Sequence, residues 1–218
     1  WKMYRTLPQE WDWQAQIPNG YTTQYHGISV FEGHYEYSGI KYVPSWGGSM
    51  FEGLMPGIVL KEKDLGTKAL GLNNQRHVDV QIAYAKEKGY KAWGFSPAAT
   101  PDGYSEFAAT PLGTAGYKDG ATVTAHATFL ALDYAPQEVQ KNIKALKELD
   151  LYSKYGFYDS VNVETGEIAK AYLALDQGMI MVSIANYLED GVIREYFHQD
   201  PIGKKPEELL KQEEFSIQ

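Results

Sequence analysis

Three carboxyl groups stand where acid–base chemistry would require them. Glu52 and Asp176 each lie within an almost purely apolar run, at residues 49–60 and 173–187. A carboxylate in such a run is costly unless it is paired, hydrogen-bonded, protonated or used in catalysis. Asp159 lies in an aromatic loop, where a carboxylate could hold water. We therefore take these three as candidate catalytic residues and expect them to point into one pocket ringed by aromatic side chains.

Glycoside hydrolysis is one chemistry that uses two such acids. One carboxyl group donates a proton to the leaving oxygen, and a second activates water or attacks the sugar. Glu52 is expected as the general acid or as an acceptor for sugar hydroxyls, and Asp159 as the base. Each acid also has a structural interpretation: Glu52 can accept loop N–H bonds at a helix start, Asp159 can close an Asx turn, and Asp176 can be an N-cap.

The elements that must position these acids are mainly helices. Apolar runs that are hydrophobic all round predict buried inner helices at residues 49–60, 124–132 and 176–188. Amphipathic periodicity predicts outer helices at 73–88 and 136–149, with shorter helices at 192–198 and 206–214. Weak alternation at 21–30 and 35–43 predicts short strands or an ordered loop. Inner helices alternating with outer ones indicate two helical layers.

Aromatic residues supply the candidate sugar contacts. The chain has 14% aromatic residues, including 17 Tyr and 5 Trp, and several fall in the turn-rich segments 90–123 and 155–162. Rings in such loops can stack on the apolar faces of sugars, although any single ring can instead belong to the core. The candidate substrate-binding residues are Trp46, Trp93, Tyr104, Tyr155 and Phe157, with Asn162 and Gln177 as hydrogen-bonding partners.

The composition excludes several other classes of function. A net charge of −8, with no block of Lys or Arg, argues against nucleic acid or an anionic membrane as a partner. There is no cysteine, no apolar run of about 18 residues, and no phosphate-binding loop or serine nucleophile elbow. His26, Glu32 and His34 match no standard metal motif, and His126 is expected as a core imidazole. No cofactor or metal is predicted, and secretion, periplasmic and cytoplasmic locations all stay open.

Four segments in this order resemble the glycoamylase-like family. They are Pro44-Ser-Trp-Gly-Gly-Ser-Met-Phe-Glu-Gly-Leu-Met-Pro56, Trp93-Gly-Phe-Ser-Pro97, Tyr155-Gly-Phe-Tyr-Asp159 and Leu175-Asp-Gln-Gly178. That family comprises putative glucoamylases, the endo-β-1,2-glucanases and the hydrolase-like part of the cyclic β-1,2-glucan synthases. The likeness runs from about residue 40 to residue 200.

The resemblance implies an all-α fold of the (α/α)6-barrel type, an α/α toroid, which needs roughly twice this length. Residues 1–218 are then a single glycoamylase-like domain forming the C-terminal half of the barrel, with long aromatic loops. An N-terminal companion segment or chain would complete the barrel and supply one essential acid. A chain that opens at Trp1 without a signal-like segment is expected for a processed chain or a piece of a longer polypeptide.

The implied activity is hydrolysis of a glucan, such as β-1,2-glucan or a related glucoside, by a carboxylate acid–base pair. Retention and inversion both stay open; inversion would require the two carboxyl groups to lie roughly 6.5–9.5 Å apart. Two alternatives stay open. One is a carbohydrate-binding module without turnover, and the other is a glucan transglycosylase or phosphorylase.

Overall fold

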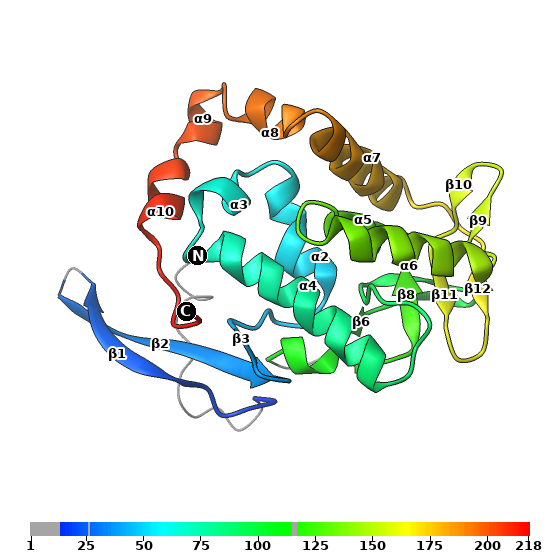
Figure 1. Ribbon diagram of the computed structural model, residues 1–218, viewed down its shortest axis with the longest axis horizontal. Helices are drawn as coiled ribbons and strands as arrows, with labels where there is room; N and C mark the ends of the chain where they lie inside the picture. Colours follow the sequence, from blue (N-terminus) through cyan, green and yellow to red (C-terminus); the bar gives the residue numbers. More distant parts are fainter. Residues whose placement is uncertain (1–13, 26, 115–116) are drawn as a thin grey trace.

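A computed structural model gives the fold of residues 14–25, 27–114 and 117–218. The described chain begins with an antiparallel sheet of three strands, β1 (Asn19–Tyr25), β2 (Ile28–Tyr37) and β3 (Ile40–Tyr42). β1 and β2 form a long hairpin that extends from the helical body (Figure 1). Its turn includes Gly27, whose φ of 78° favours glycine, and lies in the middle of the predicted strand 21–30. The fold is therefore not purely helical.

Three inner segments form one helical layer. They are α2 (Met50–Leu54) with the 3₁₀ turn η1 (Met55–Ile58), α5 (Ala125–Leu130) and α7 (Ala174–Leu188). α2 packs against α5, and α5 packs against α7, which also contacts η1. Pro56 ends α2 early because proline cannot donate within a helix, and the chain continues as η1. The expected single helix over 49–60 is thus two shorter pieces.

The second layer covers the first. α4 (Leu70–Glu87) packs on α2, α6 (Pro136–Glu148) on α5, and α8 (Val192–Phe197) on α7. In α6 the buried residues Val139, Asn142 and Leu146 recur at helical spacing, which turns one face of this amphipathic helix toward the core. Among the described residues, these helices do not close into a ring. The two predicted layers are present, and the closed barrel is not.

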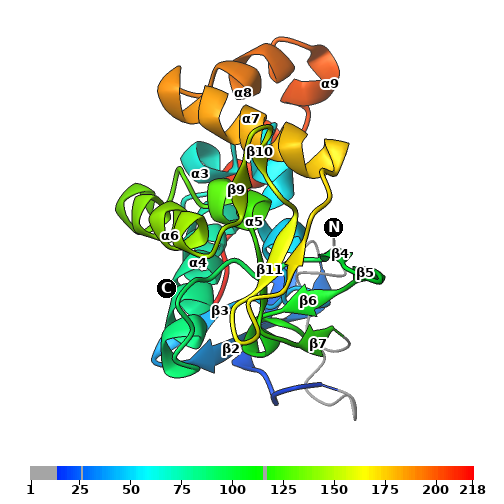
Figure 2. The ribbon, with the colours of Figure 1, turned by 90° about the vertical axis from the view of Figure 1, so that its right-hand side faces the viewer.

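Short strands order the loops between the helices. Their bounds are β4 (Ala98–Thr100), β5 (Gly103–Ser105), β6 (Phe107–Ala108), β7 (Lys118–Asp119), β8 (Thr122–Thr124), β9 (Tyr152–Ser153), β10 (Gly156–Phe157), β11 (Ser160–Asn162) and β12 (Ile168–Ala169). A second 3₁₀ turn, η2, covers Thr110–Leu112. β11 pairs with both β8 and β12, so the segment that carries Asp159 is held beside the start of α5. Figure 2 shows these strands below the layer of α7, α8 and α9.

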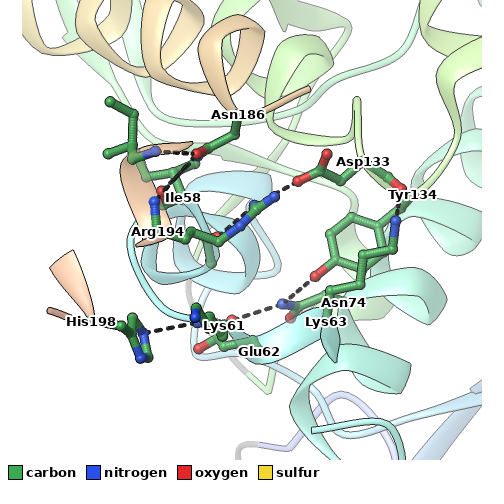
Figure 3. A network of polar contacts seen from close by, with 12 residues as sticks. Ile58, Lys61, Glu62, Lys63, Asn74, Asp133, Tyr134, Asn186, Arg194 and His198 are labelled. Carbon is green, nitrogen blue, oxygen red and sulfur yellow. Dashed lines mark hydrogen bonds and ion pairs between the residues drawn. The ribbon is translucent and has the colours of Figure 1, made fainter. Parts of the chain in front are cut away.

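A polar network connects the inner helices at the end away from the start of α5. Arg194 of α8 contacts Asp133 at 2.6 Å and donates to the Gly57 carbonyl, while Asn186 of α7 donates to the Ile58 carbonyl at 2.8 Å (Figure 3). The chain then continues through α9 (Pro201–Lys204) and α10 (Glu207–Gln212), and α10 packs on α3 (Glu62–Leu65). The C-terminal segment thereby returns to the start of the helical body. No helix among the described residues is both long and apolar enough to cross a bilayer.

Candidate active site

Asp159, Asp176 and His126 form a buried polar group. One side-chain ligand atom from each residue lies within 4.8 Å of the corresponding atoms of the other two. His126 Nδ1 is 3.2 Å from Asp176 Oδ2, and the Ala99 N–H donates to Asp159 Oδ2 at 2.6 Å. None of the three atoms His126 Nδ1, Asp159 Oδ1 and Asp176 Oδ2 forms a hydrogen bond of good geometry with a described residue, so the group is held by close polar contacts. Two of the three predicted acids are therefore neighbours.

Helix starts and a short strand place these side chains. Asp176 is the third residue of α7, whose N-cap is Leu173. The expectation that Asp176 is a plain N-cap is therefore wrong, because its carboxyl group turns toward His126 instead of capping its own helix. His126 is the second residue of α5, whose N-cap Thr124 accepts from the Ala127 N–H at 3.3 Å. Asp159 directly precedes β11.

The two aspartates hold opposite charge states. Burial, followed by a hydrogen bond to Asp176, raises the pKa of Asp159 to about 8 against a smaller lowering by the Ala99 N–H. Burial also acts to raise the pKa of Asp176, but hydrogen bonds to His126 and Asp159 outweigh it and hold that pKa below its ordinary value. At neutral pH Asp159 carries the proton and Asp176 is the carboxylate.

The separation of the two aspartates limits their roles. Carboxyl groups that flank a scissile glycosidic bond lie about 5–5.5 Å apart in retaining enzymes and about 6.5–9.5 Å apart in inverting ones. Oxygens of Asp159 and Asp176 come within 4.8 Å and the two carboxyl groups interact directly, so the pair lacks the wide gap of an inverting enzyme. They are better described as one unit that shares a proton.

The same three side chains are the residues to consider for a metal. Their spacing would also suit a small cation. Cation binding needs both carboxyl groups ionised and a free imidazole nitrogen, whereas His126 Nδ1 already contacts Asp176 Oδ2 at 3.2 Å. We therefore treat the group as an acid–base unit. Of the weaker metal candidate, His26 lies outside the described residues, and His34 is 3.0 Å from the Ser216 hydroxyl.

Glu52 occupies a separate, well-satisfied position. Its carboxylate accepts from the Gly47 N–H at 3.0 Å, from the Ser45 hydroxyl at 3.0 Å, and from both the N–H and the hydroxyl of Ser49 at 3.2 Å. The Ser49 hydroxyl in turn accepts from the Glu52 N–H, which completes a capping box at the start of α2. The capping interpretation of Glu52 is confirmed.

Two tyrosines and one glutamate connect Glu52 with the aspartates. Burial, followed by the charges of Asp176, Asp159 and Glu106, raises the pKa of Tyr104. Burial and then Glu52, which also hydrogen-bonds to Tyr117, raise the pKa of Tyr117 to about 12.

The charge of Glu106 helps to raise the pKa of both Tyr117 and Tyr104, so these three residues link Glu52 electrostatically with the two aspartates. Gly47 permits the close approach of Tyr117, since a Cβ at this position would lie 2.1 Å from the tyrosine ring.

A cavity of about 360 Å³ lies beside α2 and α4. Glu52, Glu62 and His77 line it together with mainly apolar residues, and Phe215 from the C-terminal segment also lines it. Neither Asp159 nor Asp176 belongs to its lining. The expectation that all three acids share one pocket is therefore not met by this cavity.

The predicted aromatic contacts divide by exposure. Tyr104 and Tyr155 are 61% and 73% exposed, and Trp46 is also exposed, so their rings are open to a sugar. Trp93 and Phe157 are each only 6% exposed and belong to the hydrophobic core. Their prediction as sugar platforms is corrected, because no ring face is accessible.

The two predicted polar contacts serve the local fold. Asn162 Oδ1 accepts from the N–H groups of Glu164 and Thr165, both at 3.0 Å, which is an Asx turn. The prediction that Asn162 binds sugar is therefore corrected for Oδ1, because this side-chain oxygen already accepts two hydrogen bonds from the backbone. Gln177 donates to the Phe157 carbonyl at 3.1 Å and so holds the 155–158 loop against α7. Its Nε2 group is a structural donor in this arrangement.

Sequence analysis missed His126, Tyr117 and Glu106. The signal for His126 was its place near the start of an apolar helix, as for Asp176, but a core imidazole has the same sequence pattern. Glu106 and Tyr117 lie in the turn-rich segment 90–123, and no spacing rule links them to acids elsewhere in the chain.

Comparison with known proteins identifies the family. The glycoamylase family model, described as putative glucoamylase, matches residues 16–201. The cyclic β-(1,2)-glucan synthase NdvB of Rhizobium meliloti (strain 1021) is 33% identical over 184 residues, which cover 77% of this chain and 6% of that protein. A putative glucoamylase structure from Bacteroides uniformis ATCC 8492 is 28% identical with a TM-score of 0.68, and the match covers 80% of this chain and 44% of that one.

Two further structures share the fold at 20% identity. The endo-β-1,2-glucanase of Chitinophaga pinensis, in complex with sophorotriose and glucose, has a TM-score of 0.65 over 82% of this chain and 45% of its own. The β-1,2-glucanase of Parabacteroides distasonis has a TM-score of 0.70, and the match covers 83% of this chain and 27% of that one. The chain thus spans less than half of each of these proteins. By its sequence match and its fold, it belongs to the glycoamylase family.

Proposed function

We propose that this chain supplies part of the active site of a glycoside hydrolase that acts on a glucan. The observation that carries the proposal is the buried pair of Asp159 and Asp176, one protonated and one ionised, on a glycoamylase-family fold. A carboxyl group kept protonated at neutral pH is what a general acid requires. Tyr104 is exposed, and the charges of both aspartates contribute to the raised pKa of its phenol. Its ring therefore offers a surface for sugar stacking beside the pair.

Asp159 is the general acid in this mechanism. It donates its proton to the leaving glycosidic oxygen, and Asp176 holds that proton on Asp159 beforehand. This reverses the expectation that Asp159 is the base. Because Asp176 interacts directly with Asp159 and serves to hold its proton, the base or nucleophile is a different carboxylate. The two candidates are Glu52, which hydrogen-bonds to Tyr117, and an acid from outside this chain.

The fold proposal is that residues 1–218 are one domain and form the C-terminal half of an (α/α)6 barrel. Coverage of 44–45% of two relatives supports it. Large apolar side chains on successive helices at the edge of the inner layer also support it: Met181 and Leu188 on α7, Tyr196 on α8 and Ile202 on α9 are all exposed. The remaining half of the barrel would cover them.

The substrate proposal is a β-1,2-linked glucan or a related glucoside. Two of the similar structures are named as β-1,2-glucanases, and the curated relative is named as a cyclic β-(1,2)-glucan synthase. That last name also favours one alternative, transfer of a glucosyl unit to another sugar. Chain-length analysis of the products separates transfer from hydrolysis, and dependence on phosphate separates a phosphorylase.

The deciding experiment replaces the proposed acid. In the native polypeptide that contains this chain, Asp159→Asn should lower kcat on β-1,2-glucan by about 100-fold or more, because general acid catalysis contributes this much. Activity of the parent should fall as pH rises through about 8, where Asp159 loses its proton. Initial rates of reducing-end release across pH 5 to 9.5 give both results.

Asp64→Asn, an exposed change on α3, is the matched control and should leave kcat unaltered. Full activity of Asp159→Asn would remove the proposed mechanism. Calorimetric sugar binding by the parent, with no bond cleavage, would instead identify a binding module.

A further inference from the structure

His126 is the third member of the buried group with Asp159 and Asp176. The mechanism proposed above uses Asp159 as the general acid and gives His126 no role. Its imidazole lies between the start of α5 and the start of α7. Nδ1 is 3.2 Å from Asp176 Oδ2, and Nε2 is 3.5 Å from the Thr124 hydroxyl. Both ring nitrogens therefore face polar atoms, and packing between α5 and α7 holds the ring between them.

The contact with Asp176 sets which nitrogen carries hydrogen. A carboxylate only accepts hydrogen bonds, so His126 Nδ1 must carry hydrogen to bind it. The neutral ring then accepts from the Thr124 hydroxyl through Nε2, and the imidazolium donates to that oxygen. In both states Asp176 receives an N–H donor, which stabilises its ionised form.

The other titratable groups around the pair are acids. Asp159 faces Asp176 from the segment before β11, and Tyr104 faces both aspartates from β5, itself within the field of Glu106. Among the described residues, no lysine or arginine forms an ion pair with either aspartate, whereas His126 does so with Asp176. The two carboxyl groups therefore have different partners, His126 for Asp176 and the Ala99 N–H for Asp159, and only His126 can carry a positive charge.

We propose, building on the function proposed above, that His126 is a positioning residue that holds Asp176 as the carboxylate and leaves the transferable proton on Asp159. Two adjacent acids alone could hold a shared proton on either member. With His126 bound to Asp176, the proton belongs on the other carboxyl group. Asp159 Oδ1, which forms no hydrogen bond with any described residue, can then carry this proton near Asp176 at rest and donate it to a glycosidic oxygen in catalysis.

The first test is a pH–rate profile of variants in the native polypeptide. His126→Leu keeps the volume but removes the donor. The acid limb of its pH–rate profile should move up by about one pH unit or more, because Asp176 loses the partner that favours its charged form. Its kcat at pH 7 should fall about 10-fold or more. His126→Asn keeps an N–H donor near the Nδ1 position, so it should shift less and recover most of kcat.

The matched control is His198→Asn. His198 is another buried histidine, with Nδ1 2.9 Å from Glu207 Oε1, but it lies at the end of α8. This variant should lower the melting temperature without moving the acid limb. An unmoved limb in both His126 variants, with lowered melting temperature only, would show that His126 is merely structural. If His126→Leu does not fold, the partial shift of His126→Asn carries the test.

The second test does not depend on turnover. Carboxyl ¹³C NMR of the folded chain should show Asp159 titrating at higher pH than Asp176, and His126→Asn should move the Asp176 midpoint upward. An Asp176 midpoint that stays in place overturns the role of His126. If the midpoints behave as expected while the parent protein cleaves no glucan, the proposed hydrolase function fails and the positioning role stands.

Discussion

At the scale of single residues, environment and not residue type decides what each acid does. Asp159 and Asp176 are chemically identical and nearly in contact, yet the His126 contact makes one a carboxylate and leaves the other protonated. Glu52 lies in a third setting, where backbone N–H groups and hydroxyls satisfy it. A fourth acid, Glu62, is buried with one amide donor, Asn74, at 2.8 Å.

Glu62 gives a prediction about stability and pH. Burial raises its pKa to about 7, against a smaller lowering by Asn74 (Figure 3). The folded protein thus keeps a proton that the unfolded chain releases above about pH 4.5, so stability is lost as pH rises from there to about 7. Glu62→Gln should remove this loss. Its free energy of unfolding should match the parent at pH 4.5 and exceed it by up to about 3 kcal/mol at pH 8.5.

Urea denaturation at the two pH values measures this difference. Glu164→Gln, an exposed change, should match the parent at both. Equal stability of the parent and Glu62→Gln at pH 8.5 would mean that Glu62 ionises without penalty in the folded chain.

At the scale of elements, helix packing relies on glycine in one place and tolerates it in another. A Cβ on Gly71 of α4 would lie 2.5 Å from the Glu62 carbonyl oxygen and 2.9 Å from the Lys63 backbone, so glycine allows α3 to approach α4 closely. A Cβ on Gly178 of α7 would meet nothing within 4 Å. The same residue type therefore has a steric reason at one position only.

Replacing each glycine by alanine should change stability in opposite directions. Gly71→Ala should lower the free energy of unfolding by about 1–3 kcal/mol, because backbone must move apart. Gly178→Ala should raise it by about 0.5–1 kcal/mol through helix propensity. Chemical denaturation of both variants measures the effects, and changes of the same sign would contradict this account of the α3–α4 contact.

The longer helices were predictable to within a few residues, the short helices α3 and α9 were not predicted, and the site was predictable only in part. Apolar periodicity marks α6 and α7 because it follows directly from burial of one face or of the whole helix. The contact between His126 and Asp176 depends on how α5 packs on α7, which no local pattern encodes. Likewise Trp93 and Tyr155 stand in similar aromatic segments, yet only the packing buries the first and exposes the second.

At the scale of the whole molecule, the helical layers have an open edge. α7, α8 and α9 form an arc along the top of the molecule in Figure 1, with large apolar side chains exposed on each of these helices. Exposed apolar groups on successive helices indicate an interaction surface. We infer that the remaining half of the (α/α) barrel covers this arc.

Glutamate substitutions test that inference. Met181→Glu with Leu188→Glu should lower the melting temperature of the native polypeptide by about 5 °C or more, since each buried side chain contributes about 1.5–3 kcal/mol. The same pair should leave residues 1–218 alone almost unchanged, as both side chains are exposed there. Ile28→Glu, on the β1–β2 hairpin, is the control. Unchanged melting of the full polypeptide would mean that α7 faces solvent in it too.

The 2.6 Å bond from the Ala99 N–H to Asp159 links the proton of the pair to the β4–β5 hairpin. Ala99 pairs with Tyr104 across that hairpin, and the Ser160 hydroxyl donates to the Ala99 carbonyl at 2.6 Å. This linkage is reciprocal. Displacement of the hairpin removes the Ala99 N–H donor and so raises the pKa of Asp159. Loss of the proton from Asp159 strengthens the Ala99 bond and so favours the hairpin position seen here. A sugar that moves Tyr104 would therefore change the pKa of Asp159 without contacting Asp159.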